Sequence, residues 1–177
     1  MTIEEEYILI KAAQENPEKF EPIYDRYYLP IFYYIAKRTE NQELAGEVTS
    51  VVFLKALEKL KQYEFKGAPF SAWLYRIAYN ALMDQYRANK LRRVVDFTSK
   101  QIEDVAEELD GTIDKALINK VVKVIPQLKQ EEITLLELRY FEGRRYKEIA
   151  DILEISEKNA RVKMHRIIAK LKKLLCP

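Results

Sequence analysis

Cysteine, histidine and glycine are scarce in this sequence of 177 residues. The single cysteine, Cys176, cannot form a disulfide within the chain, which points to a reducing compartment. One histidine, His165, and one cysteine cannot supply the clustered ligands of a zinc site. No glycine-rich phosphate loop is present either. We therefore expect no metal, no cofactor and no enzymatic activity.

Turn-forming residues and long apolar runs are also few. Four glycines and six prolines leave little room for tight turns, and no long alternating pattern indicates strands, so the sequence predicts an all-α fold. No apolar run approaches the roughly 18 residues that a membrane span needs. The acidic N-terminus lacks the layout of a signal peptide. We expect a cytoplasmic protein with no membrane insertion.

Charge is abundant and unevenly distributed. The net charge is only +2, yet residues 156–174 carry seven Lys or Arg against one acid. Residues 96–114 carry the reverse, seven acids against one Lys. The local charge is therefore more informative than the total.

Hydrophobic periodicity divides the chain into helices. The expected helices span residues 2–14, 20–38 with a kink at Pro30, 41–63, 70–93, 112–125, 131–141, 146–153 and 156–175. The acid-rich residues 94–111, with a short helical piece at 102–109, are interpreted as a linker. The linker would join two small helical domains, residues 1–93 and 112–177.

Residues 70–93 form the most unusual of these helices, because both of its faces are distinctive. One face is an apolar stripe for a core, made of Phe70, Trp73, Leu74, Ile77, Ala78, Ala81 and Leu82. The other face carries Tyr75, Arg76, Tyr79, Asn80, Met83, Tyr86, Arg87 and Lys90. Aromatic rings among cations suit an unstacked nucleic-acid strand, since rings stack on bases and cations bind phosphates. The alternative is a core helix with a basic end.

Residues 146–166 have the layout of a helix-turn-helix. Ile149, Ala150 and Leu153 should face inward, and Ser156 should cap the second helix. The buried stripe of that helix would be Ala160, Met164, Ile167, Ile168 and Leu171. Its outward face would carry Lys158, Asn159, Arg161, Val162, His165 and Arg166. Such a polar, cationic surface is typical of a major-groove reader. A surface helix of an ordinary bundle is the alternative.

The aromatic-basic helix and the helix-turn-helix together resemble the extracytoplasmic-function (ECF) sigma factors. These are small members of the sigma-70 family, which carry bacterial RNA polymerase to promoters. The matching stretches, in the family's order, are AGEVTSVVFLKA at 45–56, FSAWLYRIAYN at 70–80, LRYFEG at 138–143, YKEIA at 146–150, ISE at 155–157 and HR at 165–166. The resemblance covers residues 20–93 and 113–174.

The resemblance implies a function for each segment: a sigma region 2-like bundle followed by a region 4-like domain. The unwound −10 element would be bound by Phe65, Lys66, Tyr75, Arg76, Tyr79, Asn80, Tyr86, Arg87, Arg92 and Arg93. The −35 duplex would be read by Arg144, Ser156, Lys158, Asn159, Arg161, Val162, Lys163, His165 and Arg166. Core polymerase would dock on Glu47, Val48, Val51, Phe53 and Leu54. We expect a monomer that binds bacterial RNA polymerase core and promoter DNA. Many relatives are held inactive by an anti-sigma factor, which makes such a protein a candidate partner.

Four positions depart from the family pattern. Gly46 and Val51 stand where the family usually has acids, and Arg144 replaces a leucine and would add a phosphate contact. Glu154 replaces a turn glycine, so we expect a strained backbone there at a cost of about 1 kcal/mol. The alternative function is a helix-turn-helix regulator that binds duplex DNA without polymerase. Such a regulator has no use for a strand-binding face on residues 70–93.

Overall fold

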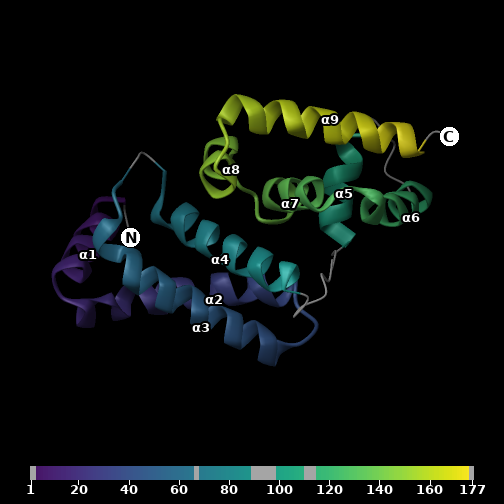
Figure 1. The fold of residues 1–177 in the computed structure, drawn as a ribbon. Coiled ribbons are helices and arrows are strands. Elements are labelled where there is room, and N and C mark those ends of the chain that lie inside the picture. Colours follow the sequence, from purple (N-terminus) through teal and green to yellow (C-terminus); the bar gives the residue numbers. More distant parts are fainter. Residues whose placement is uncertain (1–2, 66–67, 89–98, 110–114, 176–177) are drawn as a thin grey trace. The chain divides into compact units, whose positions relative to one another are not determined.

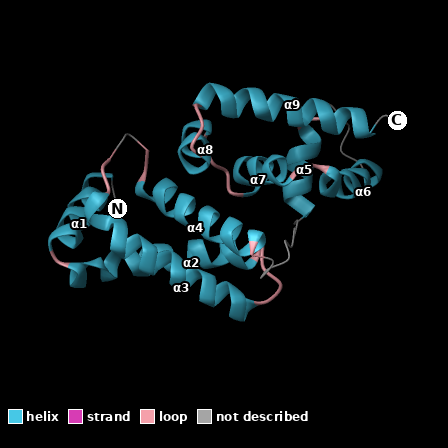
Figure 2. Cartoon of the chain, viewed as in Figure 1, coloured by secondary structure: helices cyan, strands magenta, loops and turns pink. Residues whose placement is uncertain are grey.

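The computed structural model describes residues 3–65, 68–88, 99–109 and 115–175, and these residues form helices and short connections without strands (Figures 1 and 2). The predicted all-α fold is confirmed. The chain divides into two compact units, Met1–Val94 and Val95–Pro177, which we describe separately. Within the described residues, no helix combines the length and the apolar character that crossing a bilayer requires.

The first unit is a bundle in which α2, α3 and α4 lie side by side, with α1 at one end (Figure 1). Its helices are α1 (Ile3–Glu15), α2 (Glu21–Ala36), α3 (Gln42–Lys59) and α4 (Phe70–Arg87), with 3-10 turns at Pro17–Phe20 and Leu60–Gln62. α3 begins at Asn41, whose side chain accepts a hydrogen bond from the Leu44 amide at 2.9 Å and so caps the helix. Pro30 lies inside α2, which continues through it.

Two polar anchors attach α1 to the bundle. The Gln14 side-chain amide donates to the backbone carbonyls of Leu60 and Tyr63, each at 2.8 Å. The Tyr27 hydroxyl donates to the buried carboxylate of Glu6. Burial and this hydrogen bond to Glu6 raise the pKa of Tyr27 far above its usual range. These contacts hold α1 beside the chain segment that leads into α4.

The second unit is built around its longest helix, α9 (Glu157–Leu175), which packs against α6 (Lys115–Val124), α7 (Gln130–Leu136) and α8 (Tyr146–Leu153) (Figure 1). α7 continues into a π-helical segment, Glu137–Phe141, where the Glu142 amide donates to the Glu137 carbonyl at 3.0 Å. The sequence predicts one uninterrupted helix there, because a π-helical widening leaves no mark in the apolar periodicity.

The predicted linker contains a packed helix. α5 (Ser99–Glu107) falls within residues 94–111, close to the short helical piece expected at 102–109. Ile102, Val105 and Ala106 of α5 are almost fully buried, and the helix contacts α6 and the π-helical segment. α5 therefore contributes to the core of the second unit, while its acids Glu103 and Asp104 are half-buried and Glu107 is exposed.

Candidate nucleic-acid interface

The apolar face of α4 packs into the core as predicted. Phe70, Leu74, Ile77, Ala78, Ala81 and Leu82 are all buried, and Trp73 is half-buried against Tyr63 and Phe70. On the opposite side Asn80 and Arg87 are exposed, and Arg76, Tyr79 and Tyr86 are half-buried. The helix ends at Arg87, and the predicted contacts Lys66, Arg92 and Arg93 lie outside the described residues.

Tyr75 corrects part of the predicted strand-binding face. Its side chain is 3% exposed, and its ring packs edge-to-face on Tyr34 with centroids 4.8 Å apart. Position 75 is three residues before Ala78 and seven before Leu82, so it borders the apolar stripe and turns inward with it. The prediction that Tyr75 faces an open strand is wrong, and this tyrosine belongs to the core.

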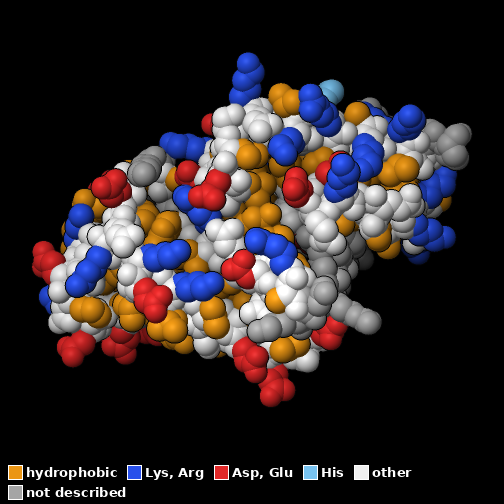
Figure 3. Space-filling view, viewed as in Figure 1, with side chains coloured by type: hydrophobic (Ala, Val, Ile, Leu, Met, Phe, Trp, Pro, Cys, Tyr) orange, Lys and Arg blue, Asp and Glu red, His pale blue; other side chains and the backbone are white. Residues whose placement is uncertain are grey.

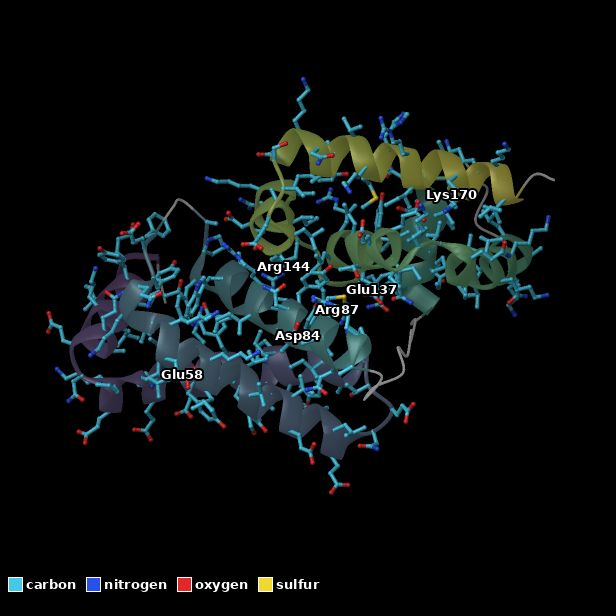
Figure 4. The ribbon with its side chains drawn as sticks, in the orientation of Figure 1. Glu58, Asp84, Arg87, Glu137, Arg144 and Lys170 are labelled. Carbon is cyan, nitrogen blue, oxygen red and sulfur yellow. The ribbon has the colours of Figure 1, made fainter. Side chains whose placement is uncertain are left out.

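The C-terminal end of α4 is held by polar contacts within the first unit. The Tyr86 hydroxyl donates to the Arg38 carbonyl at 2.7 Å, which ties α4 to the residues that follow α2. Asp84 lies 3.5 Å from the Arg87 guanidinium and 3.7 Å from the Lys55 ammonium (Figure 4 labels Asp84 and Arg87). The hydroxyl of Tyr86 is thus used structurally, whereas Arg87 is exposed and paired with Asp84.

Phe65 lies beside a surface hollow that sequence reasoning missed. The hollow has a volume of about 680 Å³ and is lined by Glu4, Tyr7, Ile8, Lys11, Glu64 and Phe65. The rings of Tyr7 and Phe65 meet at a centroid distance of 6.5 Å, and the Lys11 ammonium lies 5.4 Å from the Tyr7 ring. The sequence feature that could have indicated this hollow is a Tyr and a Lys four residues apart on α1. Recognising it requires knowing that α1 packs beside residue 65.

The predicted docking residues on α3 divide into two sets. Glu47, Val51 and Leu54 are exposed, whereas Val48 and Phe53 are each only 5% exposed. The prediction that Val48 and Phe53 contact polymerase is wrong, because neither side chain lies on the surface of the unit. Val48 shares the core-facing four-residue step of Val52 and Ala56. The ring of Phe53 is covered by aromatic residues of the preceding segment, namely Phe20, Tyr24 and Tyr28.

The helix-turn-helix of the second unit matches its prediction closely. Ala160, Met164, Ile167, Ile168 and Leu171 of α9 are all buried. In the first helix Ile149 and Ala150 point inward as expected, but Ile152 takes the core position predicted for Leu153, which is half-buried.

The turn between α8 and α9 has the predicted backbone and cap. Glu154 adopts the left-handed conformation, with φ 54° and ψ 43°, that a glycine in its place would adopt without strain. The Ser156 hydroxyl oxygen accepts a hydrogen bond from the Asn159 amide at 3.2 Å, which caps α9. Both predictions are confirmed.

The outward face of α9 is exposed and mostly basic (Figure 3). Lys158, Asn159, Val162, His165 and Arg166 are exposed, as is Ser156 at the cap. Lys163 is half-buried and, with Arg166, lines a hollow of about 300 Å³ against α7. Arg144 is half-buried, and its guanidinium lies 3.2 Å from the Glu148 carboxylate. The charge of Arg144 is thus already countered by a carboxylate.

An ion pair fastens the far side of α9 to α7. The Lys170 ammonium donates to the Glu132 carboxylate at 2.7 Å, and the Lys129 amide donates to the same oxygen, also at 2.7 Å (Figure 4 labels Lys170). Burial by itself would raise the pKa of Glu132, but the hydrogen bonds from Lys170 and Lys129 outweigh it and hold the pKa below its usual range. This Lys170–Glu132 ion pair, which we call the brace, attaches α9 to α7.

Comparison with known proteins gives matches to both units. Two family models match, Sigma-70 region 2 over residues 23–92 and Sigma-70, region 4 over residues 118–171. The RNA polymerase sigma factor SigZ of Bacillus subtilis is 30% identical over 156 residues, which cover 88% of this chain and 86% of SigZ. The ECF RNA polymerase sigma factor BldN of Streptomyces coelicolor is 28% identical over 94% of this chain, which spans only 64% of the length of BldN.

A solved structure has a similar fold. The structure of CnrH in complex with the cytosolic domain of CnrY aligns over 95% of both chains, with a TM-score of 0.63 and 23% sequence identity.

The matches to Sigma-70 region 2 in the first unit and to Sigma-70, region 4 in the second identify a transcription initiation factor. The chain belongs to the sigma-70 family of RNA polymerase sigma factors, as a member of the ECF type with regions 2 and 4. Members of this family direct promoter recognition and are not enzymes. The family and the non-enzymatic function inferred from the sequence are thereby confirmed.

Proposed function

We propose that this chain brings core RNA polymerase to two-part promoters, with residues 1–93 serving the −10 element and residues 112–177 the −35 element. The observation that carries the proposal is the outward face of α9, where Lys158, Val162, His165 and Arg166 are exposed at three- and four-residue steps. Side chains on one exposed face of a capped second helix can enter a major groove together. Cations among them bind phosphates, and Arg can also pair with guanine.

The −10 strand would lie along the polar side of α4. Asn80 is exposed, and half-buried Arg76 and Tyr79 lie within the preceding turn. Removing a base from the duplex costs a few kcal/mol, so a preformed aromatic and polar surface must offset that cost. Phe65 and Tyr7, across the hollow beside α1, offer further rings to an unstacked base.

Core polymerase would dock on the exposed side of α3. Glu47, Val51 and Leu54 face solvent, and Leu54 is 59% exposed. Leu57 of α3 and Tyr33 of α2 are further exposed apolar side chains in the same unit. Scattered exposed apolar residues are normal on a protein surface, but several in one helical bundle suit a partner's surface. Because it would bind RNA polymerase and promoter DNA, the protein would act in the cytoplasm. When not bound to polymerase, it would be a monomer.

An inhibitory partner is also part of the proposal. CnrH, whose fold is similar, was solved with the cytosolic domain of CnrY. A protein of that kind could cover Val51 and Leu54, which would block polymerase docking. Co-purification of a small partner that prevents the chain from binding core polymerase would support this; unhindered binding in its presence would contradict it.

The test of the function is transcription in vitro with bacterial core polymerase, this protein and a library of promoter-like DNA. Initiation at a shared two-part sequence, absent without the protein, is the expected result. The alternative is a polymerase-independent regulator. Tight binding to duplex DNA without any initiation would favour that alternative and would count against docking through Val51.

A further inference from the structure

The ring of Tyr146, the first residue of α8, lies against two guanidinium groups from other segments. The central carbon of the Arg161 guanidinium is 4.6 Å from the ring centroid, and that of Arg139 is 4.9 Å from it. Both distances are within the range of a cation–π interaction, for which arginine is well suited because its planar group stacks on aromatic faces. Tyr146 therefore connects the π-helical segment, α8 and α9.

Arg161 is held a second time by its own helix. Its guanidinium donates to one carboxylate oxygen of Glu157 from two nitrogens, at 2.6 Å and 3.2 Å. Arg139 is fixed as well, since it donates to the Arg144 carbonyl at 3.1 Å, in the turn that leads into α8. The first turns of α9 are thus attached to α8 by a set of contacts that we call the Tyr146 clamp: Arg139, Tyr146, Glu157 and Arg161.

The other cations on the outward face of α9 differ from Arg161. All three side chains are exposed, but in the part of the chain that the structure describes Lys158 and Arg166 show no ion pair and no ring contact, whereas Arg161 has both. The charge of Arg161 is already paired with the Glu157 carboxylate, so a phosphate bound by Arg161 would lie close to that carboxylate. Placing the Glu157 carboxylate near the negative charge of DNA costs free energy.

We infer that Arg161 is a positioning residue of the −35 site and not a phosphate contact. Together with Tyr146 and Glu157 it fixes the orientation of the first turns of α9 on α8. Lys158, Val162, His165 and Arg166 are then left to meet the DNA. The inference rests on the proposed −35 recognition and refines it.

The salt dependence of binding separates the two roles. A side chain that neutralises one phosphate contributes about 0.9 to the slope of log affinity against log salt concentration. The full chain, assembled with core polymerase, would be titrated on a duplex with the selected −35 element and on the same duplex with one base pair changed. Arg161→Gln should leave the salt slope unchanged and reduce the preference for the matched duplex by at least about threefold. The matched control Lys158→Gln should lower the slope by about 0.9.

Three further variants test the clamp itself. Tyr146→Phe keeps the ring and should keep the wild-type preference, whereas Tyr146→Leu should reproduce the loss seen with Arg161→Gln. Arg161→Lys retains the charge but not the planar fork, so it should also lose preference. Helix content and thermal unfolding of each variant would show that the fold is retained.

Three results would overturn the inference. A slope lowered by Arg161→Gln as much as by Lys158→Gln, and restored by Arg161→Lys, would make Arg161 a phosphate contact. A wild-type complex that does not distinguish the two duplexes would remove the proposed −35 recognition, and the inference with it. A preference in the wild type that no clamp variant changes would leave −35 recognition standing and exclude the clamp.

Discussion

Asn80 is the side chain of α4 best placed to meet a base. It is exposed, whereas Tyr79 beside it is half-buried and Tyr75 one turn earlier is fully covered. An amide offers both hydrogen-bond donors and an acceptor, so it can pair with the edge of a base that has left the duplex. A half-buried tyrosine presents its ring with little rotamer freedom left to lose.

The first prediction concerns these two residues. Tyr79→Ala should impair promoter opening by about 1–3 kcal/mol, the range for losing one base–aromatic contact. Asn80→Ala should impair it by about 0.5–1.5 kcal/mol, the range for losing one hydrogen bond. Thermal unfolding and affinity for core polymerase should stay at wild-type values. Glu43→Ala, an exposed change at the start of α3, is the control and should open promoters normally. If opening, stability and polymerase binding all fell together, these side chains would instead be part of the core.

Glu154 gives a second prediction at the same scale. Its left-handed backbone favours glycine, so Glu154→Gly should raise the free energy of unfolding by about 1 kcal/mol. Chemical denaturation of the full chain measures this change. Lys147→Gly, in the first turn of α8, should lower the same free energy, by at most about 1 kcal/mol. Destabilisation by Glu154→Gly would show that the turn is relaxed.

α9 is attached to the second unit by two kinds of contact, apolar packing and an ion pair. Its buried stripe lies against the core, and Lys170 reaches the Glu132 carboxylate on α7. Because only the ionised carboxylate of Glu132 forms an ion pair with the Lys170 ammonium, this contact responds to pH. Its contribution is complete above the ordinary pKa of 4.5 and is lost as the pH falls through the lower folded-state pKa.

This dependence is the third prediction. The wild-type free energy of unfolding should decline below pH 4.5 more steeply than that of Glu132→Gln. At neutral pH the variant should be less stable by about 0.5–1 kcal/mol, since the pair is partly exposed. Denaturant unfolding at a series of pH values measures both. Parallel pH profiles for the two proteins would show that Glu132 has the same pKa in the folded and the unfolded chain.

The periodicity of the sequence predicts elements better than it predicts which marginal residues are covered. The stripe of α9 is right in full because its five residues repeat without ambiguity. Tyr75 was assigned to the wrong face because it borders the stripe of α4, and only the partner helix decides whether a bordering side chain is buried. Val48 and Phe53 were assigned to docking by the family resemblance, and both are buried in the first unit. Tyr7 and the Tyr146 clamp were missed since they arise from tertiary contacts. The cap at Ser156 and the backbone of Glu154 were predictable because turn chemistry is local.

At the scale of the whole molecule, the two proposed DNA-reading surfaces belong to different compact units. The polar face of α4 lies in Met1–Val94 and the outward face of α9 in Val95–Pro177. Changes at separate sites without shared partners usually add in free energy.

Additivity is the fourth prediction. If Asn80→Ala and Arg166→Ala each lower initiation about tenfold, the double variant should lose about a hundredfold. Run-off transcription from one promoter measures all three proteins. Tyr79→Ala combined with Asn80→Ala is the contrasting pair, because these neighbours share one face and should deviate from additivity. A double variant of Asn80 and Arg166 no worse than either single one would mean that both residues act in one step.

The buried stripe of α9 and its outward face have no residue in common. Evolution, or a designer, can therefore replace Lys158, Val162, His165 and Arg166 without disturbing the contacts that fold the unit. The DNA-facing side of α9 can therefore change its specificity while the packing of the second unit stays the same. A set of such chains, identical except at those four positions, would recognise different −35 elements while sharing one −10 element.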